Sequence, residues 1–188
     1  MRITGGIHRG RKLKVPRTGT VRPTQDRVRE ALFSMLASGF PGGRVLDLFA
    51  GSGAVGFDAL SRGASEVVWV ERDRRACVVL QENLDLLGAK NGRVVCADVH
   101  RWVKGTGRGM RFDVVFADPP YAEAQALGFT ELMADLHSGG FCGHGDWFIA
   151  EQPVVMKALA VDGWELLRDR AYGHTRLVVY RSQKRLAD

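Results

Sequence analysis

Long apolar runs and closely spaced cysteines are both missing from this 188-residue sequence. A membrane-spanning helix needs about 20 consecutive apolar residues, and no segment approaches that length. The basic N-terminus is not followed by an apolar stretch, so no secretory signal is expected. Three scattered cysteines do not make a disulfide framework, which favours a protein of the reducing cytoplasm. The five histidines lack metal-ligand spacing, so no metal site is expected.

Acidic residues are absent from the first 25 positions, which hold seven of the 27 Lys and Arg residues. The rest of the chain has 20 basic and 21 acidic residues, so the net charge of +6 arises at the N-terminus. A cationic arm on a near-neutral body is typical of polyanion binders, although a solvated tail is the alternative. We divide the chain into an arm, residues 1–25, and one domain, residues 26–188. Four apolar residues in the arm favour a small hairpin: Ile3, Ile7, Leu13 and Val15.

From residue 44 onward, short β-rich runs alternate with helical stretches. Apolar strands separated by helices indicate a parallel sheet with helices on both faces, which is a Rossmann-like α/β fold. Little helix separates residues 164–167 from the last strand, so these segments are expected to form an antiparallel hairpin that closes the sheet. The candidate strands are residues 45–49, 66–71, 93–97, 112–117, 147–151 and 176–181.

Two helices carry clear local signals. The first is expected to begin after Thr24 as its N-cap, with Asp26 in its first turn. The second, residues 74–87, has apolar residues at helical spacing. Trp69 and Phe116 lie inside apolar strands and are predicted to be core residues. Four residues of the second helix share one face: Cys77, Leu80, Leu84 and Leu87.

A glycine-rich loop follows the first predicted strand. Gly51, Gly53 and Gly56 satisfy the G-x-G-x-x-G spacing, and Glu71 lies 20 residues beyond Gly51 at the end of the second strand. This arrangement is also that of nicotinamide dinucleotide sites. The glycines alone therefore do not identify the cofactor.

Asp47, at the tip of the first strand, distinguishes the two cofactors. A dinucleotide places its pyrophosphate at the helix N-terminus, where this carboxylate would repel it. S-adenosylmethionine has no phosphate and carries an ammonium and a sulfonium, which suit a carboxylate. The alternative role for Asp47 is to cap the following helix. We therefore predict S-adenosylmethionine as the cofactor.

Two further acids lie at the ends of the second and third strands, where ligands of open α/β sheets bind. Glu71 can accept hydrogen bonds from ribose hydroxyls, and Asp98 can meet the adenine amino group. The predicted cofactor-binding residues are Asp47, Phe49, Ala50, Gly51, Ser52, Gly53, Glu71, Arg72, Asp98, Val99 and Asp118.

The sequence Asp118-Pro119-Pro120-Tyr121 follows the fourth strand. A double proline can simply end a strand, but that leaves the acid and the aromatic residue unexplained. An exocyclic base amine is a poor nucleophile, and two acceptors aimed at its hydrogens would free its lone pair. The Asp118 side chain and the Pro119 carbonyl can serve, and proline fixes the backbone without adding N–H donors. Tyr121 offers a stacking face for the base, so these four residues are the predicted catalytic set.

The chain resembles the bacterial 16S ribosomal RNA guanine-N2 methyltransferases of the D type over nearly its whole length. The resemblance implies a seven-stranded methyltransferase fold preceded by a short N-terminal hairpin. It also implies methylation of a guanine N2 amine in a small-subunit assembly intermediate. The matching stretches are Arg2–Gly6, Arg9–Leu13, Arg22-Pro23-Thr24, Asp26–Glu30, Leu32-Phe33, Phe49–Gly53 and Asp118–Tyr121.

The same reasoning predicts which residues contact RNA. Those of the arm would meet phosphates, and those around the first helix would contact RNA or the cofactor site, the alternative being a solvated helix and cap. The predicted RNA-binding residues are Arg9, Arg11, Lys12, Arg22, Thr24, Arg27 and Arg29.

Three other functions compete with this prediction. An adenine- or cytosine-amino methyltransferase acting on DNA or another RNA would share the chemistry, but the chain has no separate target-recognition domain. A nicotinamide oxidoreductase would need a second domain or a catalytic His or Tyr-Lys pair. A non-catalytic RNA-binding factor of ribosome assembly would not need the motif at Asp118–Tyr121. We expect an enzyme that acts as a monomer on 16S rRNA, without a membrane partner.

Overall fold

The protein is described here by a computed structural model, which covers residues 1–16, 26–36, 43–120 and 128–183. The chain forms two compact units, Met1–Asp98 and Val99–Asp188. The predicted boundary after residue 25 is of another kind, because it separates an RNA-binding arm from the methyltransferase domain by function. It stays a prediction. No helix in the described ranges is both long and apolar enough to cross a membrane.

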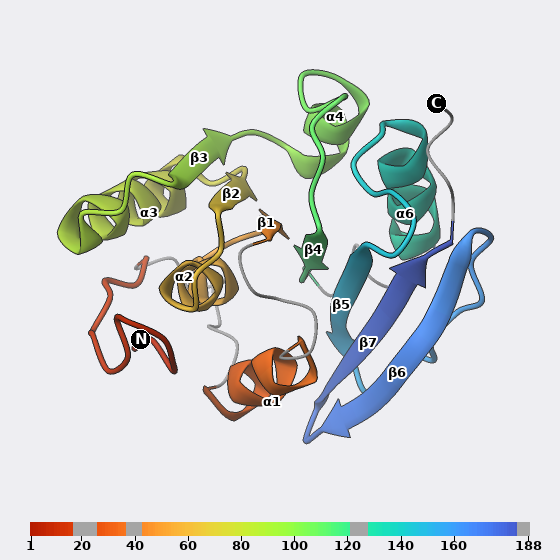
Figure 1. The fold of residues 1–188 in the computed structure, drawn as a ribbon, viewed down its shortest axis with the longest axis horizontal. Coiled ribbons are helices and arrows are strands. Elements are labelled where there is room, and N and C mark those ends of the chain that lie inside the picture. The colour runs from red at the N-terminus through yellow and green to blue at the C-terminus, as the bar shows by residue number, and fades with distance from the viewer. Residues whose placement is uncertain (17–25, 37–42, 121–127, 184–188) are drawn as a thin grey trace. The chain divides into compact units, whose positions relative to one another are not determined.

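The first unit alternates helices and parallel strands, as predicted (Figure 1). Its strands are ordered β3-β2-β1, with β2 paired in parallel to each neighbour. The elements are α1 (Asp26–Leu36), β1 (Arg44–Leu48), α2 (Ala54–Ser61), β2 (Glu66–Glu71), α3 (Arg74–Leu87) and β3 (Gly92–Cys96).

Trp69 of β2 is the centre of this unit's core. Its side chain is fully buried and its ring lies 4.7 Å from the Phe57 ring of α2. A methyl group built on Gly53 would collide with both Leu80 of α3 and Trp69. Helices α2 and α3 therefore pack against the same face of β2, and the core position predicted for Trp69 is confirmed.

Helix α3 has the predicted bounds because its ends carry their own signals. The Asp73 side chain accepts a hydrogen bond from the Arg75 N–H at 2.8 Å, and Gly88 ends the helix in the left-handed conformation. The four residues predicted to share its apolar face are all buried. The capping residues and the helical spacing of the apolar residues thus account for the bounds of α3.

The N-terminal segment forms the expected short hairpin. Arg2 and Lys12 make an antiparallel bridge, and the Ile3 N–H donates to the Arg11 carbonyl at 3.0 Å. Ile3 and Leu13 are buried. The segment runs beside α2 in Figure 1, so it is part of the first unit rather than a free tail.

The second unit holds strands in the order β4-β5-β7-β6. Strands β4 and β5 are parallel, whereas β5–β7 and β7–β6 are antiparallel. The elements are α4 (Val99–Lys104), β4 (Val114–Ala117), α6 (Gly128–Ser138), β5 (Trp147–Pro153), β6 (Trp164–Tyr172) and β7 (Thr175–Ser182).

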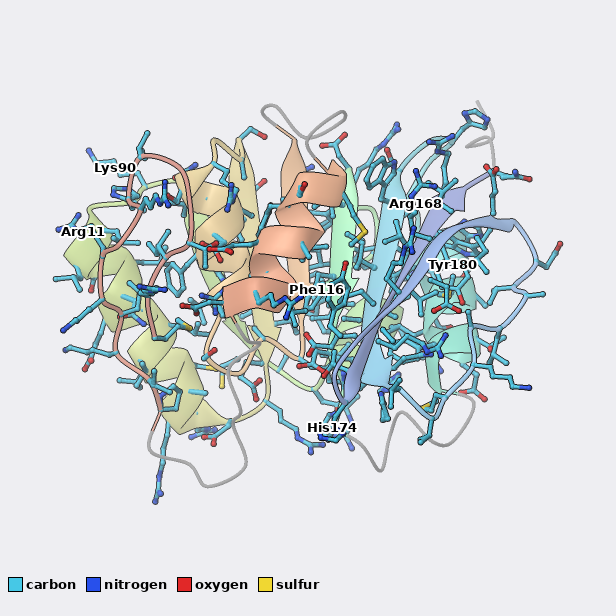
Figure 2. All side chains as sticks on the ribbon, turned by 90° about the horizontal axis from the view of Figure 1, so that it is seen from below. Arg11, Lys90, Phe116, Arg168, His174 and Tyr180 are labelled. Carbon is cyan, nitrogen blue, oxygen red and sulfur yellow. The ribbon has the colours of Figure 1, made fainter. Side chains whose placement is uncertain are left out.

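The strands of the second unit confirm the predicted terminal hairpin but change the start of the fourth strand. The terminal hairpin is confirmed, although β6 continues to Tyr172 with a register shift between Leu166 and Arg168. The fourth strand begins at Val114 rather than Phe112, because the Phe112 N–H donates to the Phe141 carbonyl outside the strand ladder. Phe116, labelled in Figure 2, is buried as predicted.

Candidate active site

The loop between β1 and α2 has an unusual backbone. Gly51 and Gly53 have positive φ angles of 51° and 71°, and Phe49 has a φ of 56°. A left-handed conformation is uncommon for a bulky aromatic residue and persists only where the surroundings impose it. Such strain is concentrated at ligand sites, which makes this loop the first part of the candidate site.

The first turn of α2 has little room for side chains. A methyl group on Gly56 would overlap the buried Trp69 indole, and one on Gly53 would meet Leu80 as well. The Trp69 indole N–H donates to the Gly53 carbonyl at 3.3 Å. These glycines therefore let the helix approach β2 closely and hold the preceding loop in place.

Three backbone N–H groups of this loop and of the first turn of α2 have acceptors within the protein. Gly51 donates to Glu71 Oε2 at 2.8 Å, Gly53 to the Ala50 carbonyl at 2.7 Å, and Gly56 to Asp47 Oδ2 at 3.0 Å. A pyrophosphate would need those N–H groups and would face the Glu71 carboxylate there. The geometry therefore disfavours a dinucleotide.

Asp47 makes the capping contact that the sequence left as the alternative. Its side chain is only 2% exposed, and its hydrogen bond to Gly56 N–H satisfies a donor in the first turn of α2. The pKa of Asp47 is raised to about 8, first by burial and then by the Glu71 charge, while the hydrogen bond from the Gly56 N–H lowers it. A cation at this carboxylate would favour its ionised form. A role in cofactor binding is compatible with the cap and stays a prediction.

Replacing Asp47 with asparagine should change how stability depends on pH. The pKa of Asp47 is about 8 in the folded protein, against 3.8 as its ordinary value. The folded state therefore holds the proton more tightly, and the stability due to this group falls as pH rises from about 4 to 8. An asparagine side chain does not titrate, so the stability of the Asp47→Asn variant relative to wild type should rise by a few kcal/mol across that window.

Urea unfolding of both proteins at several pH values measures this difference. Asp162→Asn, a change at an exposed residue of the second unit, is the matched control and should show no such trend. Parallel stability curves for wild type and Asp47→Asn between pH 4 and 8 would contradict the buried, protonated carboxyl.

Glu71, the last residue of β2, links the glycine loop to the turn after the strand. Its Oε2 accepts from Gly51 and its Oε1 accepts the Asp73 N–H at 2.8 Å. The carboxylate is thus fixed in orientation, and each oxygen retains capacity for a second donor. Glu71 is therefore placed to accept a hydrogen bond from a ligand hydroxyl.

The other predicted cofactor residues differ in exposure. Phe49, Ala50 and Asp98 are half-buried, whereas Ser52 is buried. Asp98 lies two residues beyond the end of β3, and Arg72, after β2, is exposed. Val99 is the first residue of α4 and is buried in the second unit.

The predicted catalytic motif leaves β4 directly. All four residues of β4 are buried, and Ala117 is paired with Ala150 of β5. Asp118 and Pro119 are half-buried and Pro120 is exposed, so the chain passes from the core to the surface within three residues. Tyr121 lies outside the described residues. A buried strand thus anchors the acid and the first proline.

Three of the predicted RNA-binding residues lie on the surface of the hairpin. Arg9, Arg11 and Lys12 are exposed and form no ion pair with any described residue. Figure 2 shows Arg11 at the outer edge of the first unit. Arg27 of α1 is also exposed. Arg22 and Thr24 lie outside the described residues.

The prediction that Arg29 contacts RNA is wrong. Its side chain is 1% exposed, and its Nε donates to Asp58 Oδ2 at 2.7 Å. Its Nη2 donates to Asp26 Oδ1 at 2.9 Å and to the Arg2 carbonyl at 2.7 Å. Arg29 is therefore a buried connection between α1, α2 and the hairpin.

Asp58 is the residue that sequence reasoning missed. It is fully buried in α2 and accepts from the Thr4 N–H at 2.6 Å and the Thr4 hydroxyl at 2.9 Å, besides Arg29. The signal was an acid inside the otherwise apolar helix Ala54–Ser61, since buried acids need partners. The partner that orients the hairpin could not be located without the fold.

No cluster of three or more potential metal ligands occurs among the residues that the structure describes. The basic surface of the hairpin lies in the same unit as the loop.

The sequence is similar to that of known methyltransferases. Residues 1–181 match the family described as "Conserved hypothetical protein 95". The ribosomal RNA small subunit methyltransferase D of Escherichia coli K12 is 36% identical over 194 residues, which cover 100% of this chain and 91% of that protein. The chain belongs to this family of methyltransferases.

Solved structures agree with the family. A methyltransferase from Escherichia coli is 34% identical with a TM-score of 0.83, covering 98% of this chain and 99% of the other. An S-adenosylmethionine-dependent methyltransferase from Streptococcus mutans, 16% identical, has a TM-score of 0.70 over 86% of this chain and 50% of its own. The predicted Rossmann-like methyltransferase fold is confirmed. The predicted S-adenosylmethionine cofactor accords with membership in a methyltransferase family.

Proposed function

We propose that this methyltransferase transfers a methyl group to the exocyclic N2 amine of a guanine in 16S rRNA, within the small ribosomal subunit or its assembly intermediate. The observation that carries the proposal is the Asp118-Pro119-Pro120 segment that leaves the buried strand β4. A relative named for the small-subunit ribosomal RNA covers the whole chain and supports rRNA as the substrate. The guanine follows from the family resemblance described above. A cytoplasmic monomer accords with this role.

The residues of the first unit suit the cofactor. The strained loop from Phe49 to Gly53 supplies a fixed surface, and Glu71 supplies an oriented carboxylate for the ribose hydroxyls. Asp98 would accept from the adenine amino group, and Asp47 would face the ammonium. S-adenosylmethionine, when bound, supplies a methyl group activated by its sulfonium.

The residues after β4 would activate the amine. The Asp118 carboxylate and the Pro119 carbonyl would accept its two hydrogens and draw the nitrogen toward a tetrahedral geometry. The cost of organising these acceptors is met in folding, because β4 is buried and proline restricts the backbone. Positioning of the amine supplies the remaining acceleration. Tyr121 would stack on the base.

The proposal predicts one missing methyl group in cells that lack the protein. 16S rRNA from cells with and without the gene would be digested and its modified nucleosides mapped by mass spectrometry. We expect one N2-methylguanine position to lose its methyl group and to regain it when the wild-type gene is restored. The purified protein with S-adenosylmethionine should methylate that same position on small subunits from the deletion strain.

Other results would contradict the proposal in distinct ways. Loss of a methyl group from adenine or cytosine would overturn the guanine assignment but retain the amino chemistry. An unchanged methylation map, with altered assembly of small subunits, would indicate a non-catalytic assembly factor.

A further inference from the structure

Ile7 is the most exposed large apolar residue that the structure describes. Its side chain is 84% exposed at the turn of the N-terminal hairpin, between Gly6 and Gly10, whose φ angles are 76° and 81°. Single exposed apolar residues are common on protein surfaces and need no special explanation. What distinguishes Ile7 is how firmly its backbone is held and what surrounds it.

The backbone around Ile7 is fixed to the end of α2. The Ile7 N–H donates to the Ser61 carbonyl at 2.8 Å, and the His8 N–H donates to Ser61 Oγ at 2.9 Å. The same hydroxyl donates to the Gly5 carbonyl at 2.6 Å. A methyl group on Gly6 would collide with the Ser61 backbone, so the two segments are in close contact.

A buried polar cluster holds the base of the hairpin. Thr4 makes two hydrogen bonds to Asp58, which also pairs with Arg29, and Arg29 in turn binds the Arg2 carbonyl. None of these groups is exposed enough to compete for a ligand, since all three side chains are buried. The hairpin is therefore held in place before any partner binds.

Three cationic residues follow Ile7 within five positions. Arg9, Arg11 and Lys12 are exposed on the same hairpin and have no ion-pair partners among the described residues. On an RNA surface these charges would meet phosphates, which leaves the apolar tip to meet bases. Aliphatic side chains placed against base steps are a known means of nucleic-acid recognition. An immobilised tip loses little conformational entropy on binding.

We propose that Ile7 is an RNA-contacting residue whose side chain packs against a nucleobase, and that Ser61 is a positioning residue that presents it. This inference rests on the proposed function, because it takes RNA as the ligand. Arg9, Arg11 and Lys12 provide charge-dependent affinity, whereas Ile7 provides affinity that does not depend on salt.

The test compares Ile7→Ser with the triple variant Arg9→Ala/Arg11→Ala/Lys12→Ala. The probe is the small ribosomal subunit isolated from cells that lack this protein, with KCl varied at constant Mg²⁺. We expect Ile7→Ser to weaken binding about tenfold at every salt concentration, with an unchanged slope of log K against log salt. The triple variant should instead reduce that slope by about 2 to 3.

The matched control is Val78→Ser, which changes a 58% exposed apolar residue on α3 and should leave binding unchanged. Ile7→Leu should retain most of the affinity, because it keeps an aliphatic side chain at the tip. Circular dichroism and S-adenosylmethionine binding check that the variants are folded.

Ser61→Ala tests the positioning role. We expect it to weaken binding several-fold in the wild-type background but less than twofold when Ile7 is already serine, because Ser61 acts through Ile7. Equal affinities for wild type and Ile7→Ser, or fully additive effects of the two changes, would overturn the inference. A wild-type protein that methylates no guanine on these particles would instead refute the proposed function.

Discussion

Replacing Asp118 with alanine is expected to lower the rate of methyl transfer by about 100-fold or more while S-adenosylmethionine still binds. The change removes one of the two acceptors proposed to hold the amine, and these act mainly in the transition state. The glycine loop and Glu71 are in the other compact unit and keep their hydrogen bonds. Single-turnover transfer to small subunits, with calorimetric titration of the cofactor, measures both effects.

Asparagine at position 118 separates acceptor geometry from charge. Its amide oxygen can still accept one hydrogen, so Asp118→Asn should retain more activity than Asp118→Ala. Asp162→Ala is the control, since this exposed acid of the same unit lies outside the motif. Wild-type rates in Asp118→Ala would remove Asp118 from the proposed catalytic set, and equal losses in both variants would mean that the charge itself is required.

Replacing Asp58 with alanine should destabilise the protein by about 3–5 kcal/mol, because it leaves the buried Arg29 without its main partner. Both members of the pair are essentially inaccessible, at 1% and 0% exposure, and Thr4 loses two hydrogen bonds as well. A loss of this size corresponds to a fall in Tm on the order of 10 °C. Thermal unfolding monitored by circular dichroism provides the measurement.

A surface ion pair of the same hairpin supplies the control. The distance from Lys14 Nζ to Glu82 Oε2 is 2.8 Å, close to the 2.7 Å from Arg29 Nε to Asp58 Oδ2. The side chains of Lys14 and Glu82, however, are 59% and 45% exposed. Glu82→Ala should therefore cost less than about 1 kcal/mol. Similar losses in Asp58→Ala and Glu82→Ala would show that burial does not set the strength of these contacts.

A double variant distinguishes the ion pair from simple packing. Arg29→Met/Asp58→Leu replaces two buried charges by apolar groups and should recover much of the stability lost in Asp58→Ala. It should not restore the anchor at Thr4, whose N–H and hydroxyl still lack acceptors. A double variant no more stable than Asp58→Ala would show that the unpaired Arg29 charge is not the main cause of the lost stability.

Local sequence signals located the elements that carry the candidate site, although the bounds of β1, β3 and β4 differ by one or two residues from those predicted. Strand β2 and helix α3 have the predicted bounds because β-rich composition, helical periodicity and capping residues are encoded within a few positions. The same local pattern placed Asp47 near the end of β1, the glycine loop after β1, Glu71 at the end of β2 and Asp118 after β4. The roles of the predicted cofactor-binding and catalytic residues stay predictions, and Tyr121, Arg22 and Thr24 lie outside the described residues.

The α/β fold class and the methyltransferase family were thus contained in the sequence itself, whereas the chemistry suggested for Asp118–Tyr121 stays a proposal. The tertiary structure decided how individual charges are used. It placed Arg29 in the core beside Asp58, 29 positions away in the chain. It also placed the Asp47 carboxyl where it accepts a hydrogen bond from the Gly56 N–H of α2. It also held the cationic hairpin against α2 through Thr4, 54 positions from its partner. The physical reason is that burial and pairing depend on residues distant in the chain, whereas propensity and periodicity depend only on neighbours.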